Sequence, residues 1–479
     1  MAAKEFIVAI ELGSTKIIGI AGRKNLDGSL TVLAVVKEDS TACIRKGIVY
    51  NIDKTALCLT NVINKLKNTL HTEIAQVYVG MGGQSIRSIR NVIVKDLPEE
   101  TIVTQDMINE LMDSNRNMEY PEQEIIDVAT QEYKVDAQYQ VDPVGIPCSR
   151  LEGNFLNILW RKTFYRNLNT CFENAGVTIA ELYPAPLALA DCVLTESEKR
   201  TGCALVDFGA DTTTVSIYYK NILRHLAVIP LGSNNITKDI TSLQVEETEA
   251  EVMKLKYGKA INEYMNNETT IQLPVNAERS VNANDFGYVV EARTKEIIDN
   301  VWYQVPRELR DKLLGGVILT GGGANMPGIE QAFRNYTNIE KVRVAKFITS
   351  TVNSNHADIT EHTGMMNTAL GLLAKGDINC AGEEIDPNAN LFDAPKSNSV
   401  GIAAAGRNPY ANATMASDAG NGKLRADEAR RKREEEREAL LAEEEEERLK
   451  AEEKKRNSFW NKFVKGAKKF GEQILKEEE

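Results

Sequence analysis

One stretch near the start of the chain combines a carboxylate, a glycine, two hydroxyl side chains and a lysine. In VAIELGSTKIIGIAG, a strand pattern lies on both sides of Gly13 and predicts a β-hairpin. Its turn would present backbone N–H groups and hydroxyls to an anion, and a carboxylate beside that anion is useful only if a divalent cation lies between them. We therefore expect an anion and cation site formed by Glu11, Gly13, Ser14, Thr15 and Lys16.

A second stretch, ALVDFGADTTTVSIYY, repeats this design much later in the chain. Asp207 and Gly209 take the places of the first carboxylate and glycine, and Asp211 and a run of threonines follow. The threonines are Thr212, Thr213 and Thr214. Two hairpins of this phosphate-binding type predict two similar halves of the protein that close on one ligand.

A third stretch, GGVILTGGGANMPGI, places three consecutive glycines after a buried strand and before a probable helix. These are Gly321, Gly322 and Gly323. Because glycine has no Cβ, the backbone here can approach a ligand closely.

The elements that must position these residues follow from the pattern of the first 375 residues. Short apolar runs alternate with longer stretches of helical periodicity such as KTALCLTNVINKLKNTL, which predicts an α/β architecture. The 479 residues are 42% hydrophobic and 26% charged, so two or more domains with sizeable cores are expected. The formal net charge of −12 and the absence of a basic stripe in the body of the chain argue against nucleic-acid binding.

Cysteine usage and hydropathy indicate a reducing, cytosolic environment. Seven cysteines are scattered without a C-x-x-C pair, and MAAKEFIVAIELG enters a strand pattern without a hydrophobic signal core. No apolar run approaches the ~20 residues needed to cross a bilayer. Any membrane contact is therefore expected to be peripheral.

The composition changes twice after residue 375. Residues 376–422 are small and polar with frequent Gly, Pro and Asn, which predicts a flexible linker. Residues 423–456 are almost wholly charged and include favourable i,i+4 pairs such as Glu428 with Lys432. We interpret this segment as a charged helical spacer, with a disordered charge run as the alternative.

The final segment, NSFWNKFVKGAKKFGEQILKEEE, has an apolar face with a cationic border when drawn as a helix. Because it lies beyond the linker and spacer, we expect residues 457–476 to bind an anionic membrane surface; a partner groove and the protein's own core are the alternatives. The apolar face contains Phe459, Trp460, Phe463, Val464, Phe470, Ile474 and Leu475. The cationic border includes Lys462, Lys465 and Lys469.

The order of these motifs resembles a known protein superfamily. ELGSTK, VDFGADTTTV and ILTGGGANMPGI are similar to the phosphate 1, phosphate 2 and adenosine motifs of the actin, Hsp70 and sugar-kinase superfamily. QVYVGMGGQSIRS, PAPLALADCVL, EAEVMKLKYG, VVEARTKEII and the amphipathic tail further resemble the bacterial FtsA family. This resemblance covers nearly the whole chain apart from the linker and spacer.

The resemblance implies an α/β, actin-like (duplicated ribonuclease-H-like) fold with two lobes and an inserted α+β subdomain. The core of lobe 1 is then expected at residues 4–81, 160–200 and 350–375, with the inserted subdomain at 82–159. The core of lobe 2 is expected at 201–235 and 311–349, with a further subdomain at 236–310.

The resemblance also implies ATP and Mg²⁺ as ligands. Adenine and ribose would lie between the glycines at 321–323 and a helix that carries Glu251 and Lys254, which share one helix face at i,i+3. Taken without the resemblance, this pair would be read as a surface ion pair. The two hairpins would hold the phosphates, with Glu11 and Asp207 holding Mg²⁺ through water and serving as the candidate catalytic carboxylates.

Two positions depart from the superfamily pattern. Phosphate 1 usually begins with Asp, whereas this chain has the longer Glu11. Relatives that hydrolyse ATP readily carry Gln or Glu at the position that aligns with Ala185. Without a group to position the attacking water, we expect at most a slow ATPase in which nucleotide serves mainly as an assembly ligand.

By resemblance, the function is that of a cell-division protein on the cytoplasmic face of the cell membrane at the septum. It would form actin-like filaments with itself, bind the C-terminal peptide of FtsZ near Glu291 and Arg293, and receive later division proteins on the insertion. A PilM-like pilus-assembly protein and a kinase or ATPase of the same superfamily are the alternatives. For a sugar kinase, we find no carboxylate placed to activate a substrate hydroxyl.

Overall fold

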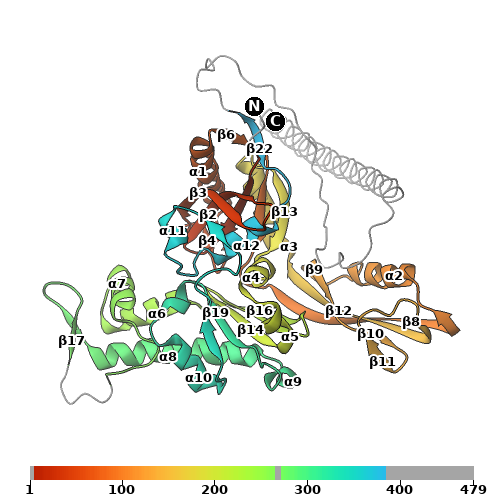
Figure 1. Cartoon of the computed structure of the whole chain (residues 1–479). Helices are drawn as coiled ribbons and strands as arrows, with labels where there is room; N and C mark the ends of the chain where they lie inside the picture. Colours follow the sequence, from red (N-terminus) through yellow and green to blue (C-terminus); the bar gives the residue numbers. More distant parts are fainter. Residues whose placement is uncertain (1–4, 265–270, 385–479) are drawn as a thin grey trace, which may run out of the picture. The chain divides into compact units, whose positions relative to one another are not determined.

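The computed structural model describes residues 5–264 and 271–384, and these residues build two large β-sheets with helices packed around them (Figure 1). The predicted spacer, the predicted membrane helix and nearly all of the predicted linker lie outside the described residues. None of the helices within the described ranges combines the length and apolar character needed to span a bilayer.

The first sheet forms the core of lobe 1. Its strands β1, β2 and β3 are antiparallel neighbours; β7 pairs with β1 in parallel, and β13 pairs with β7 in parallel. The sequence IVAIEL of β1 is buried along nearly its whole length, as expected for a strand covered on both faces. In sheet order, the strands are β13 (Ile179–Pro184), β7 (Val77–Met81), β1 (Ile7–Leu12), β2 (Lys16–Lys24), β3 (Leu30–Asp39) and β21 (Val352–Asn353).

Helices pack against this sheet through aliphatic side chains. Helix α1 contacts β2 and β3, while α12 contacts β1, β2 and α4. A side chain at Gly19 on β2 would collide with Val62 of α1, so glycine here permits close packing. The helices of lobe 1 are α1 (Ile52–Leu70), α3 (Lys162–Asn174), α4 (Ala185–Val193), α11 (Ala357–Thr360) and α12 (Asn367–Lys375).

Lobe 2 repeats the strand arrangement of lobe 1. Strands β14, β15 and β16 are antiparallel neighbours; β19 pairs with β14 in parallel, and β20 pairs with β19 in parallel. This repeat confirms the predicted duplicated α/β fold. The strands are β14 (Cys203–Phe208), β15 (Thr213–Tyr219), β16 (Ile222–Ile229), β19 (Gly316–Thr320) and β20 (Val342–Val344).

Helices and one small hairpin complete lobe 2, and α8 is the longest helix among the described residues. The helices are α5 (Glu196–Thr201), α6 (Ser233–Ile240), η1 (Thr241–Leu243), α7 (Glu247–Tyr257), α8 (Ala283–Gln304), α9 (Arg307–Arg310), η2 (Gly322–Asn325) and α10 (Ile329–Thr337). The hairpin pairs β17 (Gln272–Pro274) with β18 (Ser280–Asn282).

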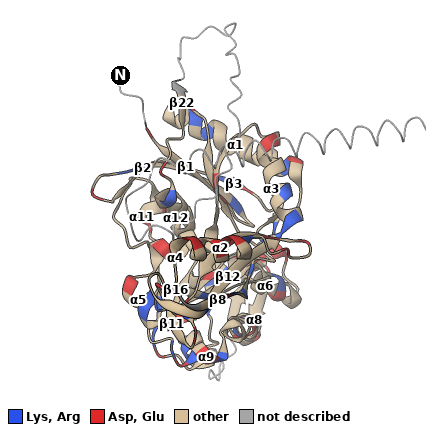
Figure 2. Ribbon diagram, turned by 90° about the vertical axis from the view of Figure 1, so that its right-hand side faces the viewer, with Lys and Arg blue, Asp and Glu red and all other residues tan. Residues whose placement is uncertain are grey.

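The inserted subdomain contributes five strands to the larger sheet and has its own small core. Helix α2 packs on β8 and β12, and Figure 2 looks onto this side of the molecule. The elements are β8 (Arg87–Ile102), α2 (Gln105–Arg116), β9 (Gln123–Thr130), β10 (Tyr133–Val135), β11 (Gln138–Gln140) and β12 (Pro147–Arg161). The stretch TQDMINELMDSNRN thus forms helix α2, and QEYKVDAQYQVD contains strands β10 and β11.

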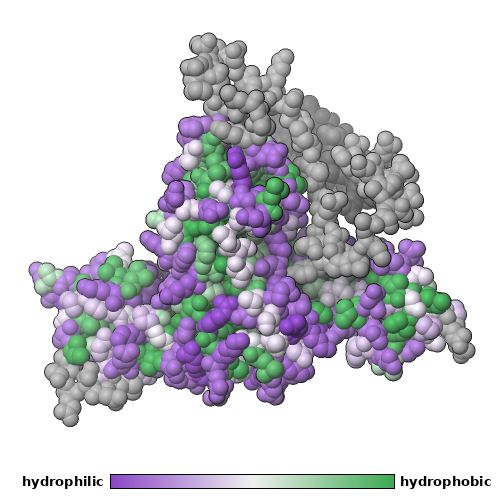
Figure 3. All heavy atoms as spheres, in the orientation of Figure 1, coloured by the Kyte–Doolittle hydropathy of each residue, from purple (hydrophilic) through white to green (hydrophobic). Residues whose placement is uncertain are grey.

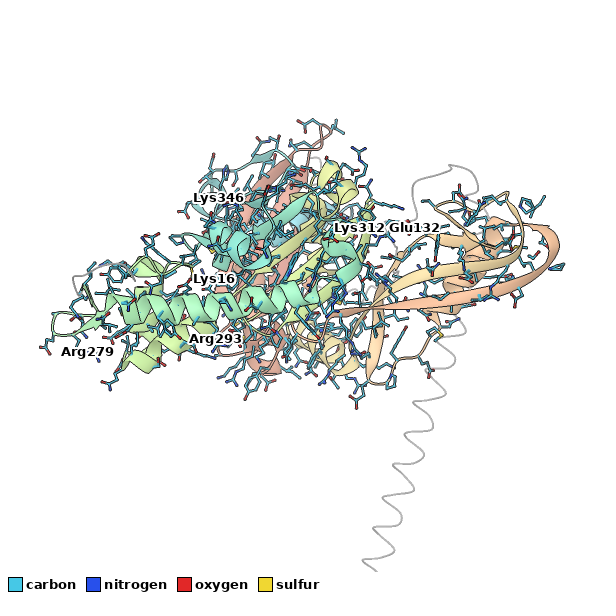
Figure 4. All side chains as sticks on the ribbon, turned by 90° about the horizontal axis from the view of Figure 1, so that it is seen from below. Lys16, Glu132, Arg279, Arg293, Lys312 and Lys346 are labelled. Carbon is cyan, nitrogen blue, oxygen red and sulfur yellow. The ribbon has the colours of Figure 1, made fainter. Side chains whose placement is uncertain are left out.

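The sheet of the inserted subdomain continues into the sheet of lobe 2, although the chain enters and leaves the insertion from lobe 1. Arg87 on β8 pairs with Ala227 on β16. Beside this junction, Glu132 accepts hydrogen bonds from Lys220 at 3.1 Å and from Arg224 at 2.9 Å. Figure 4 labels Glu132 on the side of the molecule where the insertion meets lobe 2. Side-chain contacts therefore tie the insertion to a lobe that is distant in sequence.

Two short strand pairs complete the fold. Strands β4 (Ile44–Arg45) and β5 (Ile48–Val49) form a hairpin before α1. Strand β6 (Thr72–Ile74) pairs with β22 (Ala381–Glu384), which ends the described chain.

Candidate functional site

The first predicted hairpin is the turn between β1 and β2. The Gly13 N–H donates to the Lys16 carbonyl at 3.0 Å, and a Cβ on Gly13 would lie 2.8 Å from that same oxygen. Glycine is therefore required for the close approach that shapes this turn. Lys16, labelled in Figure 4, is the first residue of β2 and is exposed.

The second predicted hairpin, between β14 and β15, has the same geometry. The Gly209 N–H donates to the Thr212 carbonyl at 2.9 Å, and a Cβ on Gly209 would lie 2.8 Å from that oxygen. The hydroxyl of Thr213 donates to the Leu231 carbonyl at 2.9 Å. Thr213 is therefore bound to the backbone of its own lobe. The other two predicted threonines, Thr212 and Thr214, do not make this hydrogen bond.

The two carboxylates occupy matching positions at the ends of β1 and β14. Burial, reinforced by the negative charge of Asp207, raises the pKa of Glu11 to about 8. Burial also raises the pKa of Asp207 to about 6. The Oε2 atom of Glu11 is buried and has no hydrogen-bond partner among the described residues. This arrangement is suited to a bound cation, which would favour the ionised form of both groups.

The first turn of α12 joins the two lobes beside these carboxylates. Hydrogen bonding to the Thr368 side chain and the Ala369 backbone acts to lower the pKa of Glu11, against the larger effect of burial. Asn367 donates to the Thr320 hydroxyl at 3.0 Å, at the end of β19 in lobe 2. The Oδ1 atom of Asn367 is a second buried oxygen without a partner in the described part of the chain. Two unsatisfied acceptors therefore lie around the junction of the lobes.

The three glycines form the turn that follows β19. Gly321 has φ +86°, and a Cβ on it would collide with Oδ1 of Asp207. A Cβ on Gly323 would collide with the ring of Phe208, whereas the nearest atom to a Cβ on Gly322 would be Met365 Sδ at 3.7 Å. The glycine turn is thus packed directly on the end of β14, next to the second carboxylate.

The predicted pair on α7 consists of one buried and one accessible group. The Lys254 side chain is 6% exposed and donates to Glu251 at 2.6 Å, to Thr237 at 2.8 Å and to the Ser233 carbonyl at 3.2 Å. The Glu251 side chain is 41% exposed. Lys254 therefore holds α7 against α6, and Glu251 is the member available to a ligand.

Glu291 and Arg293 on α8 face different neighbours. Glu291 accepts from the Tyr336 hydroxyl at 2.8 Å and from the Asn262 N–H at 3.2 Å. Arg293, labelled in Figure 4, binds both carboxylate oxygens of Asp239 on α6. Both side chains thus hold α8 to the rest of lobe 2.

Several residues that were not predicted from the sequence support the hairpins. The buried Ser40 hydroxyl donates to the Gly13 carbonyl at 2.7 Å. The N–H of Gly47 donates to the Ser14 hydroxyl at 2.9 Å, and the N–H of Lys46 donates to Asp211 at 3.2 Å. In IRKGIV, the glycine between β-branched residues on the two sides of the turn, Ile44 and Ile48, is a weak signal that could have drawn attention to this hairpin.

Comparisons with known proteins agree with this architecture. The family model described as "Cell division protein FtsA" matches residues 204–361, and the model "SHS2 domain inserted in FTSA" matches residues 83–159. A "Cell division protein FtsA" of Porphyromonas gingivalis is 31% identical over 381 residues, which is 78% of this chain and 78% of that protein. The Escherichia coli protein of the same name is 25% identical over 78% of this chain and 90% of its own length.

A solved structure, "PilM-PilN type IV pilus biogenesis complex", is similar in fold with a TM-score of 0.53 and 14% identity. The match covers 80% of this chain and 99% of that chain. At this identity the likeness supports the actin-like fold alone. The identity and coverage of the relatives, together with the inserted SHS2 domain, show that this chain belongs to the FtsA family of cell division proteins.

Proposed function

We propose that this cell division protein binds ATP with Mg²⁺ between its two hairpins and uses the nucleotide to control assembly. The observation that carries the proposal is the pair Glu11 and Asp207. Burial raises the pKa values of both carboxyls, and Glu11 has a buried oxygen without a hydrogen-bond partner among the described residues. Carboxylate oxygens and phosphate oxygens are the ligands that Mg²⁺ prefers, so the donor set fits this ion.

The remaining predicted residues would each contact a different part of the nucleotide. Gly13, Ser14, Thr15 and Lys16 would hold phosphates on one side, and Gly209, Thr212 and Thr214 on the other. Glu251 would contact the ribose, with Lys254 fixing its position. Gly321, Gly322 and Gly323 would allow the adenosine to approach the backbone. Bound Mg²⁺ would supply positive charge between the carboxylates and the phosphates.

Hydrolysis is expected to be slow. Ala185 begins α4 and lies near Gly80 and Gly82 at the end of β7. Its methyl group cannot orient a water molecule or accept its proton. Nucleotide would therefore act mainly by favouring the closed arrangement of the lobes, which we propose is the form that assembles into filaments.

The region at 236–310 is proposed as the docking region for the C-terminal peptide of FtsZ. Figure 3 shows apolar side chains at the surface over α7, where Val252 and Leu255 are exposed at i,i+3 spacing. Because Glu291 and Arg293 are already bound within the chain, exposed neighbours on these helices would provide the contacts. Later division proteins would dock on the inserted subdomain, which also exposes apolar residues such as Val92 and Val94.

Membrane attachment is proposed through residues 457–476 on the cytoplasmic face of the cell membrane at the septum. One short amphipathic helix binds a bilayer reversibly, with each lysine near an anionic surface adding about 1 kcal/mol. A filament presents many such helices together and binds with much higher avidity. Nucleotide-controlled assembly would therefore also control membrane attachment.

One experiment separates nucleotide binding from membrane attachment. The full chain and a chain lacking residues 457–479 are compared for binding of Mg·ATP and for pelleting with anionic liposomes. We expect equal ATP affinity and loss of pelleting on deletion. Electron microscopy on lipid monolayers with ATP should show filaments only for the full chain. A full chain that binds no adenine nucleotide, or a truncated chain that still pellets, would contradict the proposal.

A further inference from the structure

The turn between β4 and β5 touches three separate parts of the molecule. It consists of Lys46 at φ +50° and Gly47 at φ +70°. Left-handed backbone at both positions is typical of the tight two-residue turn of a hairpin. The backbone of these two residues makes each of the contacts described below.

The first two contacts reach both phosphate hairpins. The Gly47 N–H donates to the Ser14 hydroxyl at 2.9 Å in lobe 1. The Lys46 N–H donates to the Asp211 carboxylate at 3.2 Å in lobe 2. The hydroxyl of Ser14 accepts this hydrogen bond and keeps its own hydrogen for a phosphate oxygen. The turn and a bound phosphate would therefore share one side chain.

The third contact reaches the root of the inserted subdomain, where residues 82–86 join β7 to β8. The Gln84 N–H donates to the Lys46 carbonyl at 2.9 Å. A Cβ on Gly47 would lie 2.5 Å from the Cα of Gly83, so these two backbones are in direct contact. The Gln84 carbonyl in turn accepts from the Trp160 ring N–H at 3.3 Å, near the end of β12. Both chain connections of the insertion thus meet at this point.

We propose that the Lys46–Gly47 turn is a relay that couples nucleotide at the two hairpins to the root of the inserted subdomain. The inference rests on the proposed nucleotide function and assigns a regulatory role to that site. Because every contact of the turn involves backbone atoms, a displacement of Ser14 or Asp211 cannot be absorbed by rotation of a lysine side chain. Closely packed backbones pass small shifts to their neighbours.

The relay predicts which substitutions should change the coupling between nucleotide and the root of the inserted subdomain. Lys46→Ala should have no effect on coupling, since the lysine side chain makes none of the three contacts. Gly47→Ala should abolish coupling, because the added methyl group displaces the root at Gly83. Gly176→Ala is the matched control: Gly176 has φ +67°, so it carries a similar backbone strain, and a Cβ there meets no atom within 4 Å.

Hydrogen exchange of the Gln84 amide in the full chain tests the relay, with and without saturating Mg·AMPPNP. In the unmodified chain we expect nucleotide to slow this exchange by roughly 5- to 150-fold, the usual range of coupling between sites. Lys46→Ala and Gly176→Ala should respond equally. Gly47→Ala should bind the nucleotide and lose the response. Asp211→Ala removes the lobe 2 contact without adding atoms and should weaken the response even if Gly47→Ala fails to fold.

The outcomes distinguish the relay from the binding site. If the unmodified chain binds nucleotide and the Gln84 amide does not respond, the relay is wrong and nucleotide binding stands. The same conclusion holds if Gly47→Ala and Asp211→Ala both respond normally. If the unmodified chain binds no nucleotide, the proposed function fails and the relay fails with it.

Discussion

The negative charge of Asp207 raises the pKa of Glu11 across the junction of the two lobes, in addition to the larger effect of burial. With a pKa of about 8, the Glu11 carboxyl carries a proton at pH 7 in the absence of a cation. A carboxyl group that holds a metal ion, directly or through bound water, must be deprotonated. Cation binding and proton release are therefore linked at this residue.

Binding of Mg·ATP at pH 7 should release up to one proton from Glu11. Calorimetry in buffers of different ionisation enthalpy measures the number released. Glu11→Gln has no carboxyl proton to lose, so its binding should release fewer protons and depend less on Mg²⁺. Equal release by the variant and the unmodified chain would show that Glu11 does not hold the cation.

Glu11 should also make the nucleotide-free protein less stable as pH rises. The pKa of Glu11 is about 8 in the folded protein and 4.5 ordinarily. The folded state therefore holds more protons than the unfolded state between pH 4.5 and about 8. The free energy of unfolding therefore falls as pH rises through this range. Denaturant unfolding at several pH values should show a smaller decline for Glu11→Gln; an unchanged decline would contradict the assignment.

Gly321→Ala should impair nucleotide binding beyond its effect on backbone strain. Gly321 has φ +86°, and a methyl group there would collide with Asp207. Gly145→Ala is a close control, because Gly145 has φ +87° and open space around it. Titration with a fluorescent ATP analogue should show weaker binding for Gly321→Ala alone. Equal affinity in both variants would show that the glycine turn is not part of the nucleotide site.

Glu132→Gln should loosen the inserted subdomain from lobe 2. The Arg224 side chain is 11% exposed, and it would lose a charged partner at 2.9 Å. We expect a loss of about 1–2 kcal/mol, between the values typical of exposed and buried ion pairs. Glu263→Gln breaks the exposed pair with Lys259 and should cost at most about 0.5 kcal/mol. Thermal unfolding compares the two variants, and equal effects would contradict this role of Glu132.

Tyr78→Phe should release the segment after α12. The buried Tyr78 hydroxyl accepts from the Asp377 N–H at 3.1 Å and from the Ile378 N–H at 2.9 Å. The hydroxyl also donates to Asp377 Oδ1 at 3.0 Å, and the loss of these three bonds should cost about 1–3 kcal/mol. Faster hydrogen exchange of these two amides is the expected result, whereas Tyr139→Phe, at a 66% exposed position, should leave them unchanged. Unaltered exchange in Tyr78→Phe would contradict the anchoring role.

The fold class and the hairpins could be predicted because their signals are local. Strand alternation, the glycines at 13 and 209, and the glycine run at 321–323 each depend on backbone geometry within a few residues. The predicted α/β duplication is confirmed by the matching strand order of the two sheets. The roles assigned to individual site residues stay predictions.

Contacts between distant segments could not be predicted in this way. The sequence contains no signal that Asn367 reaches Thr320, that Lys46 binds Asp211, or that the insertion joins the sheet of lobe 2. Nor does it distinguish the buried Lys254 from the exposed Glu251 on one helix face. By itself, the sequence determined which residues could bind phosphate and cation, because hairpin and glycine chemistry is local. Only the tertiary structure decided which of them are buried, paired or available, because packing between segments far apart in the chain determines solvation and hydrogen-bond partners.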